Sequence, residues 1–352
     1  MVYYDFGAER SMPTIRDVAK RAGVAPITVS RVINNSGYVS QETRAGVEAA
    51  IAELQYVPNS LARSLRFKQT KTIGLVLTDV TNPFWTTVAR GVEDVASQRG
   101  FNVILCNTDE SEAKQGEYLS VLLQKQVDGV LLAPVNSTTG AVQLIQRQGV
   151  VVVVIDRRVF NAQVDVVRGD SEGGAYQLTR YLLSLGHRRI AILTGPEGVS
   201  TAQDRVAGYA QALREAGLAV DQTLIYYGEF TQASGYEMTQ KALLSRPRPT
   251  ALFAGNNFIA IGASWALAEA RLRAPEDMTL VAFDDIPPAL VLDPFLTVAA
   301  QPAYEMGRRA TELLVDRLAG NGPASYQEIV LPTEIIARRS AGPPSNGQHI
   351  GK

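Results

Sequence analysis

The chain has 352 residues, of which 46% are hydrophobic and 20% are charged, the composition of an ordinary globular protein. This length suggests two or three domains and allows a core to be buried without disulfides or structural metal. Cys106 is the only cysteine, which excludes an intramolecular disulfide, and no apolar run approaches the roughly 18 residues of a membrane-spanning helix.

The two ends of the chain resemble tails. Residues 1–12 lack the apolar core and small-residue cleavage site of a secretory signal. We expect residues 1–12 and 341–352 to be disordered. The single cysteine fits a reducing compartment, so we expect a cytoplasmic protein with no membrane partner.

Charge is distributed unevenly along the chain, although the net charge is only −1. Residues 13–68 hold eight Lys or Arg and four Asp or Glu, which gives +4 and leaves −5 for the remainder. A basic segment on an acidic body is typical of a DNA-binding module. A small basic domain without any nucleic-acid role would show the same balance.

Residues 13–57 are predicted to form a helical domain. Thr14 is suited to cap a first helix, and Gly23 is suited to the left-handed position that ends it. A second helix is expected from Pro26 to about Asn34, and a third from Ser40. Two short helices joined by a tight glycine turn predict a helix-turn-helix.

The residues of this segment match a known pattern. It reads T-I-x-D-V-A-x-x-A-G-V-x-x-x-T-V-S-R-V-I-N, followed by V-S-x-x-T-R. This pattern resembles the headpiece of the LacI/GalR family of transcription regulators. In such heads the second helix enters the major groove of DNA. The resemblance implies a homodimeric repressor that binds double-stranded DNA at a palindromic operator.

By that resemblance, three residues of the second helix contact bases: Pro26, Ile27 and Arg31. An arginine pairs with guanine O6 and N7, whereas Pro26 and Ile27 offer only apolar contact, for instance to thymine methyls. Two alternatives stay open. For Arg31 the alternative is a surface ion pair, which is the less favoured role, and for Ile27 it is plain packing.

Thr28, Ser30 and Asn34 are suited to contact the DNA backbone. One position departs from the family pattern, because Ala25 stands where a capping serine is usual. Loss of such a cap costs roughly 1 kcal/mol. A DNA phosphate is one group that would satisfy the free N–H groups.

Residues 58–70 resemble the family's hinge helix. Pro58 ends the preceding helix, and a helix of about eight residues is too short to be stable alone. The resemblance places Leu65 as a wedge between bases in the minor groove. An ordinary linker with a leucine facing the body is the alternative.

Residues 71–340 alternate short apolar runs with amphipathic segments, which predicts parallel, doubly wound α/β sheets. Strands are expected at residues 73–78, 102–106, 129–133, 150–155, 189–194, 224–227, 251–254 and 280–283. Helices are expected at residues 84–99, 112–125, 174–185, 202–216 and 259–271.

Several runs, among them TIGLVLTDVTNPFW, LGHRRIAILTGP and AFDD, resemble the two-lobed periplasmic-binding-protein fold of LacI/GalR regulators. The resemblance implies three crossings between lobes, near residues 170, 299 and 325. Ligands of open α/β sheets bind at the carboxyl ends of strands, so the space between the lobes is the expected pocket.

Polar and aromatic side chains follow the predicted strands and crossings. Their donors and acceptors suit sugar hydroxyls, and the rings suit the C–H face of a sugar. The set also resembles the ligand residues of ribose-type binding proteins, which implies a monosaccharide or a derivative as effector. These residues are Asn82, Phe84, Trp85, Asp156, Arg157, Arg205, Phe230, Asn256, Asp284 and Gln301.

Individually, these residues have ordinary alternatives, such as core packing for Phe84 and Phe230. Trp85 stands where phenylalanine is common in the family, and Asn257 replaces a usual aspartate. Val199 stands where purine-responsive relatives carry arginine, which makes a purine effector less favoured.

The sequence also allows two other functions to be compared with a regulator. An enzyme is disfavoured because no phosphate-binding glycine motif follows a strand, and no metal or cofactor motif is present. A secreted sugar-binding transport protein would share the body but would have a signal peptide and no headpiece. A purine-responsive regulator remains the alternative within the family.

Overall fold

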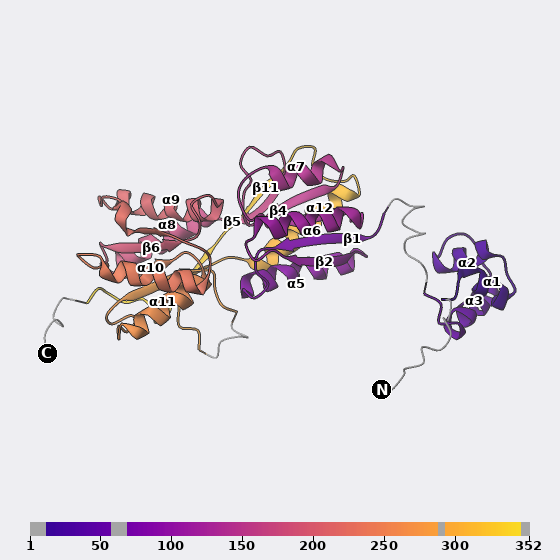
Figure 1. Ribbon diagram of the computed structural model, residues 1–352, viewed down its shortest axis with the longest axis horizontal. Helices are drawn as coiled ribbons and strands as arrows, with labels where there is room; N and C mark the ends of the chain where they lie inside the picture. Colours follow the sequence, from indigo (N-terminus) through magenta and orange to yellow (C-terminus); the bar gives the residue numbers. More distant parts are fainter. Residues whose placement is uncertain (1–11, 58–68, 288–292, 346–352) are drawn as a thin grey trace, which may run out of the picture. The chain divides into compact units, whose positions relative to one another are not determined.

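The computed structural model describes residues 12–57, 69–287 and 293–345. The chain forms two compact units that divide between Thr70 and Lys71, and each unit has its own core (Figure 1). Within the described ranges, no helix has the length and apolar character needed to cross a membrane.

The smaller unit contains three helices: α1 (Ile15–Ala22), α2 (Pro26–Ile33) and α3 (Gln41–Glu53). Thr14 and Asp17 form a reciprocal capping box at the start of α1, and Gly23 ends this helix with φ +68°. The six buried residues are Val18, Ala19, Val29, Val32, Val47 and Ala50. Ala22, Ile33, Ile51 and Leu54 are partly buried and pack against this core.

The larger unit has two lobes, each built on a six-stranded sheet. The first sheet has the order β11-β5-β4-β3-β1-β2, and all its strands are parallel. Its strands are β1 (Thr72–Leu77), β2 (Asn102–Asn107), β3 (Gly129–Leu132), β4 (Val151–Ile155), β5 (Asp165–Gly169) and β11 (Glu328–Leu331).

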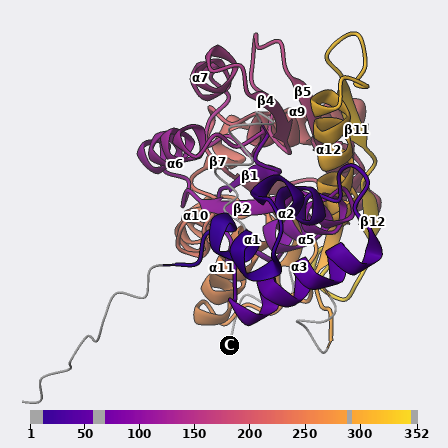
Figure 2. The same cartoon turned by 90° about the vertical axis from the view of Figure 1, so that its right-hand side faces the viewer.

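Four helices cover the two faces of the first sheet (Figure 2). On one face lie α5 (Pro83–Gln98) and α12 (Ala303–Leu318), and on the other lie α6 (Glu112–Gln124) and α7 (Gly140–Arg147). This is the doubly wound arrangement that the alternation of apolar and amphipathic segments predicts.

The second sheet repeats the same topology in the order β12-β10-β9-β8-β6-β7. Its strands are β6 (Ile190–Thr194), β7 (Ile225–Tyr227), β8 (Ala251–Ala254), β9 (Thr279–Phe283), β10 (Thr297–Ala300) and β12 (Glu334–Ile336). Helices α8 (Ser171–Ser184) and α9 (Ser200–Glu215) cover one face, and α10 (Gln232–Leu244) and α11 (Asn257–Glu269) cover the other. A short 3₁₀ helix, η1 (Gln222–Leu224), precedes β7.

The structure has four strands that were not expected, β5, β10, β11 and β12, and three other features also differ from the expectation. The strand β12 pairs with β10 in the antiparallel sense, so the second sheet is not wholly parallel. The chain crosses between lobes after β5, after β10 and between β11 and β12, so the third crossing is at residues 332–333 and not near 325. The ordered chain also continues past residue 340, where the Gly342 carbonyl accepts hydrogen bonds from His187 and Thr279.

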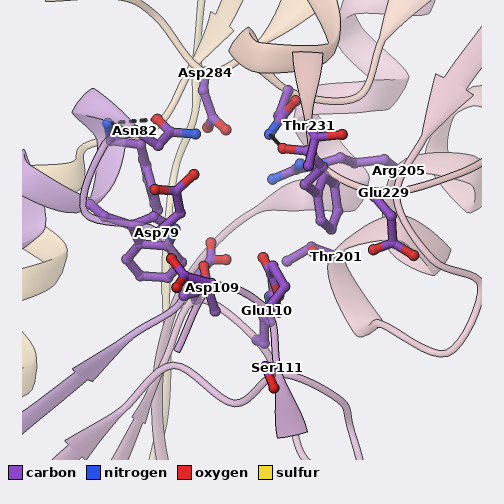
Figure 3. Close-up of a pocket in the computed structure, with 17 residues that line it drawn as sticks. Asp79, Asn82, Asp109, Glu110, Ser111, Thr201, Arg205, Glu229, Thr231 and Asp284 are labelled. Carbon is purple, nitrogen blue, oxygen red and sulfur yellow. Dashed lines mark hydrogen bonds and ion pairs between the residues drawn. The ribbon is translucent and has the colours of Figure 1, made fainter. Parts of the chain in front are cut away.

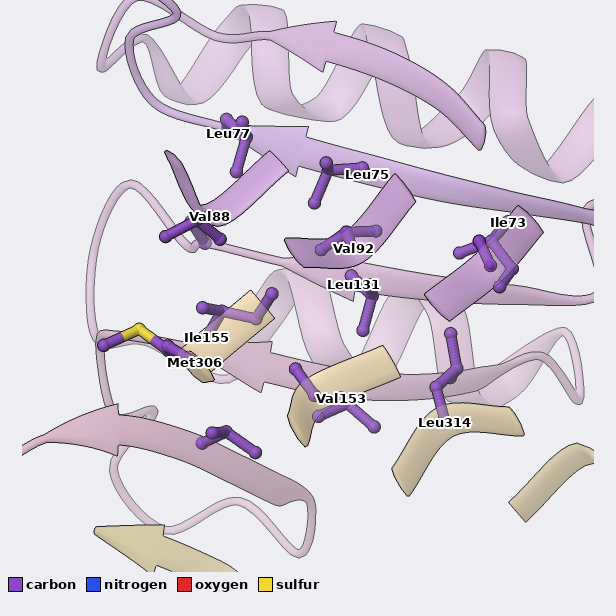
Figure 4. Packing of buried hydrophobic residues seen from close by; sticks show 14 of the residues in the cluster. Ile73, Leu75, Leu77, Val88, Val92, Leu131, Val153, Ile155, Met306 and Leu314 are labelled. Carbon is purple, nitrogen blue, oxygen red and sulfur yellow. The ribbon is translucent and has the colours of Figure 1, made fainter. Parts of the chain in front are cut away.

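Alternation along the strands divides the first lobe into two cores. Ile73, Leu75 and Leu77 of β1 face α5 and α12 and pack with Val88 and Met306 (Figure 4). Val76, between them, faces α6 and α7 instead. A strand covered on both faces reads as a continuous apolar run, which is why β1, β3 and β4 were predicted from the sequence, whereas the inner strand β5, interrupted by Arg168, was not.

Helices α5 and α12 approach each other closely through two glycines. A Cβ atom at Gly91 would overlap the carbonyl oxygen of Tyr304, and one at Gly307 would overlap that of Val88. The backbones therefore pack directly against each other, which fixes the position of α5. The amino terminus of α5 carries Asn82, Phe84 and Trp85.

We predict that Gly91→Ala lowers the free energy of unfolding by about 1–3 kcal/mol, because the new methyl group forces the two helices apart. Urea unfolding of the full chain measures this change. Gly116→Ala is the matched control, because a Cβ at that position of α6 meets no atom within 4 Å. The control should raise the stability by about 0.5–1 kcal/mol. Equal effects of the two substitutions would contradict the close packing.

Candidate functional site: a cavity between the two lobes

A cavity of about 460 Å³ lies where the carboxyl ends of the two sheets face each other (Figure 3). Nine of the ten residues that the sequence proposed line it: Asn82, Phe84, Trp85, Asp156, Arg157, Arg205, Phe230, Asn256 and Asp284. These residues are far apart in the sequence, and the repeated strand-helix topology brings them together.

Two aspartates hold equivalent positions in the two lobes. Asp156 follows β4 and Asp284 follows β9, and both have φ +65°, which a short polar residue tolerates better than most. Each donates its N–H to the neighbouring strand, to Val167 and Ala299 respectively, at 2.9 Å. The matched backbone geometry directs one carboxylate from each sheet into the cavity.

Burial dominates the electrostatics of this pair. The Asp156 and Asp284 side chains are buried, and desolvation raises the pKa of both carboxyls, that of Asp284 to about 6. The Asp284 carboxylate accepts a hydrogen bond from Gln301 Nε2 at 2.7 Å. Asp156 Oδ1 has no partner among the described residues.

Two buried arginines complete the charged interior. Burial opposes the charge of Arg157, but its bidentate pair with Glu110, at 2.5 and 2.7 Å, raises its pKa overall. The Arg205 guanidinium lies 4.0 Å from the centre of the Phe283 ring and donates to the carbonyl of Gly255. The Nε atoms of Arg157 and Arg205 are buried without a partner in the described part of the chain.

The aromatic residues occupy opposite sides of the cavity. Phe84 and Trp85 of the first lobe meet edge to face, with ring centroids 4.9 Å apart. Phe230 of the second lobe lies near both guanidiniums, 5.4 Å from that of Arg157 and 5.9 Å from that of Arg205. Phe84 belongs to the core of the first lobe as well as to the lining, so its two proposed roles coexist.

Two asparagines cap helices at the cavity wall. Asn82 Oδ1 accepts from the Phe84 N–H, and Asn256 Oδ1 accepts from the Ile259 N–H. Asn82 also exchanges two hydrogen bonds of 2.9 Å with Asn257 of the other lobe. The departure noted at position 257 therefore forms an uncharged amide bridge between the lobes.

Two sequence signals lie differently from the expectation. Gln301 does not line the cavity. Its Nε2 donates a hydrogen bond to the carboxylate of Asp284, which does line it. Val199 is the buried N-cap residue of α9 and also lies outside the lining, so it does not itself shape the cavity wall.

Eight lining residues were not proposed from the sequence: Thr78, Asp79, Asp109, Glu110, Ser111, Thr201, Glu229 and Thr231. The segment from Asp109 to Ser111 follows the end of β2, so the strand-end rule applied there would have found it. Glu229 and Thr231 flank Phe230 and were visible by adjacency alone.

The interior is suited to a polyhydroxyl ligand. Asp156 Oδ1 can accept a hydrogen bond, and the two arginine Nε atoms can donate one, and a hydroxyl group both donates and accepts. Buried polar atoms without partners are costly, so a ligand that satisfies them gains affinity. The described residues contain no cluster of His, Cys, Asp and Glu that would hold a metal ion.

In the smaller unit, the proposed base contacts lie on the open side of α2. Pro26, Ile27 and Arg31 are exposed, and Ile27 is 51% exposed and absent from the core, which rules out plain packing. Arg31 forms no ion pair with any described residue. These three residues therefore share a free surface.

The proposed backbone contacts are less exposed. Thr28, Ser30 and Asn34 are half-buried, and Asn34 Nδ2 donates to the Ser30 carbonyl at 2.7 Å. Ala25 provides no side-chain cap to α2. Leu65, the proposed wedge, lies outside the described residues.

We predict that Asp284→Asn stabilises the protein above pH 6. The raised pKa means that the folded state keeps a proton that the unfolded chain loses between about pH 4 and 6, so the free energy of unfolding falls as the pH rises through this window. Asparagine keeps the acceptor for Gln301 and tolerates φ +65°. The advantage of the variant should grow by about 1 kcal/mol between pH 5 and 7.5 in thermal unfolding. A constant difference between the two pH values would contradict the buried, protonated carboxyl.

Comparison with known proteins assigns both units. The family described as periplasmic binding proteins and sugar binding domain of LacI family matches residues 70–336. The family described as bacterial regulatory proteins, lacI family, matches residues 14–59.

Two curated relatives are similar over nearly their whole length. The chain is 39% identical over 332 residues to the ribose operon repressor of Escherichia coli (strain K12), covering 94% of this chain and 100% of that protein. It is 35% identical over 331 residues to the HTH-type transcriptional repressor PurR of Haemophilus influenzae (strain PittEE), covering 94% and 98%.

Solved structures of LacI-type regulators resemble the whole chain as well. A complex of the transcriptional regulator CelR with cellobiose is 36% identical, with a TM-score of 0.72 over 93% of this chain and 99% of that one. The Lac repressor dimer bound to operator and the anti-inducer ONPF is 27% identical, with a TM-score of 0.82 over 94% and 100%. The chain therefore belongs to the LacI family of DNA-binding transcriptional repressors, which are not enzymes, and it joins a helix-turn-helix headpiece to a two-lobed effector-binding domain.

Proposed function

We propose that this repressor controls its affinity for a palindromic DNA operator through a small sugar, a monosaccharide or a close derivative, that binds in the cavity between the lobes. The observation that carries this proposal is the buried set of unpartnered atoms, Asp156 Oδ1, Arg157 Nε and Arg205 Nε, beside three aromatic rings. Relatives that act on the ribose operon or bind cellobiose support a sugar as the ligand class.

In this proposal, the polar residues bind the hydroxyls and the rings bind the C–H faces of the sugar. Phe84 and Trp85 contact the ligand from one lobe and Phe230 contacts it from the other. Gln301 acts through Asp284, whose carboxylate it positions. The polar contacts are Asn82, Asp156, Arg157, Arg205, Asn256 and Asp284.

We further propose that two copies of the chain bind DNA together in the cytoplasm, where the operator is. The Lac repressor relative, a dimer on its operator, supports this arrangement. The exposed residues Pro26, Ile27 and Arg31 would contact bases, and Leu65 would insert into the minor groove. The backbone contacts would come from Thr28, Ser30 and Asn34.

In this proposal, sugar binding and operator binding are thermodynamically coupled. A ligand that contacts both lobes favours one lobe arrangement, and any arrangement that changes how two copies meet changes DNA affinity. By reciprocity, operator DNA must then change sugar affinity by the same factor. The proposal therefore requires measurements of both ligands on the same protein.

We predict that Asp156→Asn weakens sugar binding by about 10-fold to 100-fold, because a charged acceptor is replaced by a weaker one. Titration calorimetry with pentoses, hexoses and purines on the full chain measures the affinity. Gel shifts with and without the sugar measure the response of operator binding. The variant should retain operator binding and lose its response to the sugar.

Asp316→Asn is the matched control, because Asp316 of α12 lies beyond the cavity lining. It should bind the sugar as the wild type does. Tight binding of a purine with no response to any sugar would replace the sugar proposal with a purine-responsive repressor.

We predict that Arg31→Ala weakens operator binding by roughly 1–3 kcal/mol and relaxes selectivity at one base pair per half-site. Binding to a library of operator variants at fixed salt measures both effects. Arg21→Ala is the control, since the Arg21 guanidinium pairs with Glu53, and it should leave base selectivity intact. Unchanged selectivity in Arg31→Ala would contradict the proposed docking of α2.

A further inference from the structure

The charges that line the cavity are strongly unbalanced. Two guanidiniums, those of Arg157 and Arg205, face the space together with six carboxylates. The carboxylates belong to Asp79, Asp109, Glu110, Asp156, Glu229 and Asp284. Carboxylates therefore outnumber cations by four, and a sugar-sized space with this lining has a negative potential at neutral pH.

The surplus of negative charge is located near the solvent and not in the buried interior. The interior residues Asp156, Arg157, Arg205 and Asp284 are buried and contain equal numbers of the two signs. The surplus lies nearer the solvent, on Asp79, Asp109 and Glu229, which we term the acidic rim. Glu110, the sixth carboxylate, is bound to Arg157.

The acidic rim surrounds the cavity from both lobes. Asp79 and Asp109 belong to the first lobe and Glu229 to the second, and their side chains lie on different sides of the space in Figure 3. Asp79 is half-buried, and its Oδ1 accepts from the Thr81 N–H at 2.8 Å, so its position is fixed. Lys114 pairs with Asp109, whereas Asp79 and Glu229 form no salt bridge within the described residues, although Glu229 lies near enough to the Arg157 guanidinium to interact with its charge.

We propose that the acidic rim restricts the effector to uncharged polyols and excludes the phosphorylated form of the same sugar. This inference rests on the proposed sugar effector and specifies its charge. A phosphate ester adds close to two negative charges at neutral pH. Its neighbours at the mouth of the cavity would be carboxylates, whereas the guanidinium atoms that remain unpartnered, Arg157 Nε and Arg205 Nε, lie in the buried interior.

A cationic ligand fits the rim but not the interior. Arg157 Nε and Arg205 Nε need acceptors, and an ammonium group has none to offer. Hydroxyl groups supply acceptors to the arginines and donors to Asp156 Oδ1. The acidic rim therefore disfavours anionic ligands, and the interior favours ligands with hydroxyl groups.

Ligand binding in the cavity can be measured through the fluorescence of Trp85. Trp85 and Trp265 are the only tryptophans, and only Trp85 lines the cavity, so the full chain with Trp265→Phe reports cavity binding by fluorescence. We titrate this protein with D-ribose, D-ribose 5-phosphate and D-glucosamine, with D-glucose as the neutral partner of the amino sugar. Ribose 5-phosphate should bind at least roughly tenfold more weakly than ribose at low salt.

Salt and rim variants separate charge from size. The Debye length falls from about 10 Å at 0.1 M salt to about 3 Å at 1 M, so the discrimination between ribose and its phosphate should shrink at high salt. Asp79→Asn combined with Glu229→Gln should shrink the same ratio at low salt. Glu237→Gln is the matched control, because this exposed glutamate of α10 lies outside the cavity lining, and it should leave the ratio unchanged.

Three results would overturn the inference. One is binding of ribose 5-phosphate as tight as that of ribose. Another is a ratio that responds neither to salt nor to the rim variant. The third is tighter binding of glucosamine than of glucose. If no neutral sugar changes Trp85 fluorescence while another ligand class does, the proposed sugar effector is wrong and the inference falls with it.

Discussion

The cavity depends on two aspartates that are held in the left-handed conformation at the ends of equivalent strands. Asp156 and Asp284 have the same φ and donate the same backbone hydrogen bond to the next strand of their sheets. Because the two sheets have the same strand order, the two carboxylates enter one space from opposite walls. Burial raises the pKa of both groups, so this arrangement has a cost in stability that Arg205 and Gln301 offset only in part.

The two lobes contact each other on more than one side of that space. Arg158 pairs with Asp204, and its N–H donates to Ser200 Oγ at 2.8 Å. Ser200 in turn donates its N–H to Ser137 Oγ. The lobes are therefore held together by polar contacts that lie outside the proposed ligand set, and the ligand adds to contacts that already exist.

The sequence was informative where a strand is buried on both faces. Continuous apolar runs marked β1, β4 and β9. The strand-end rule, together with the resemblance to ribose-type binding proteins, then gave nine lining residues, of which Arg205 lies within α9 and not at a strand end. Four strands were not predicted: β5, β10, β11 and β12. The strand β5 is buried but is interrupted by Arg168, and β10 has only four residues. The edge strands β11 and β12 are half-exposed and form no continuous apolar run. The third crossing was misplaced for the same reason, since it lies between these two strands.

The direction of individual side chains could not be predicted from the sequence. The strand-end rule places a residue near the cavity but does not say which way it points, so Gln301 was assigned to the ligand although it supports Asp284 from behind. Ile27 posed the same problem in the headpiece, because a single apolar residue in the first turn of a helix is compatible with either the core or the surface. Only the packing of the three helices decides, and it leaves Ile27 exposed.

The bridge between Asn82 and Asn257 shows how one departure from the family pattern changes the energetics of the cleft. Each amide donates to the other at 2.9 Å, and neither carries a charge. An aspartate at position 257 would accept from Asn82 but could not donate in return, and it would add another negative charge beside an already acidic lining. The amide pair therefore favours lobe contact without opposing a neutral ligand. A ligand shifts an equilibrium only by its differential affinity for the two arrangements. Under the proposal that the effector favours contact between the lobes, the bridge reduces the binding free energy that the effector must contribute.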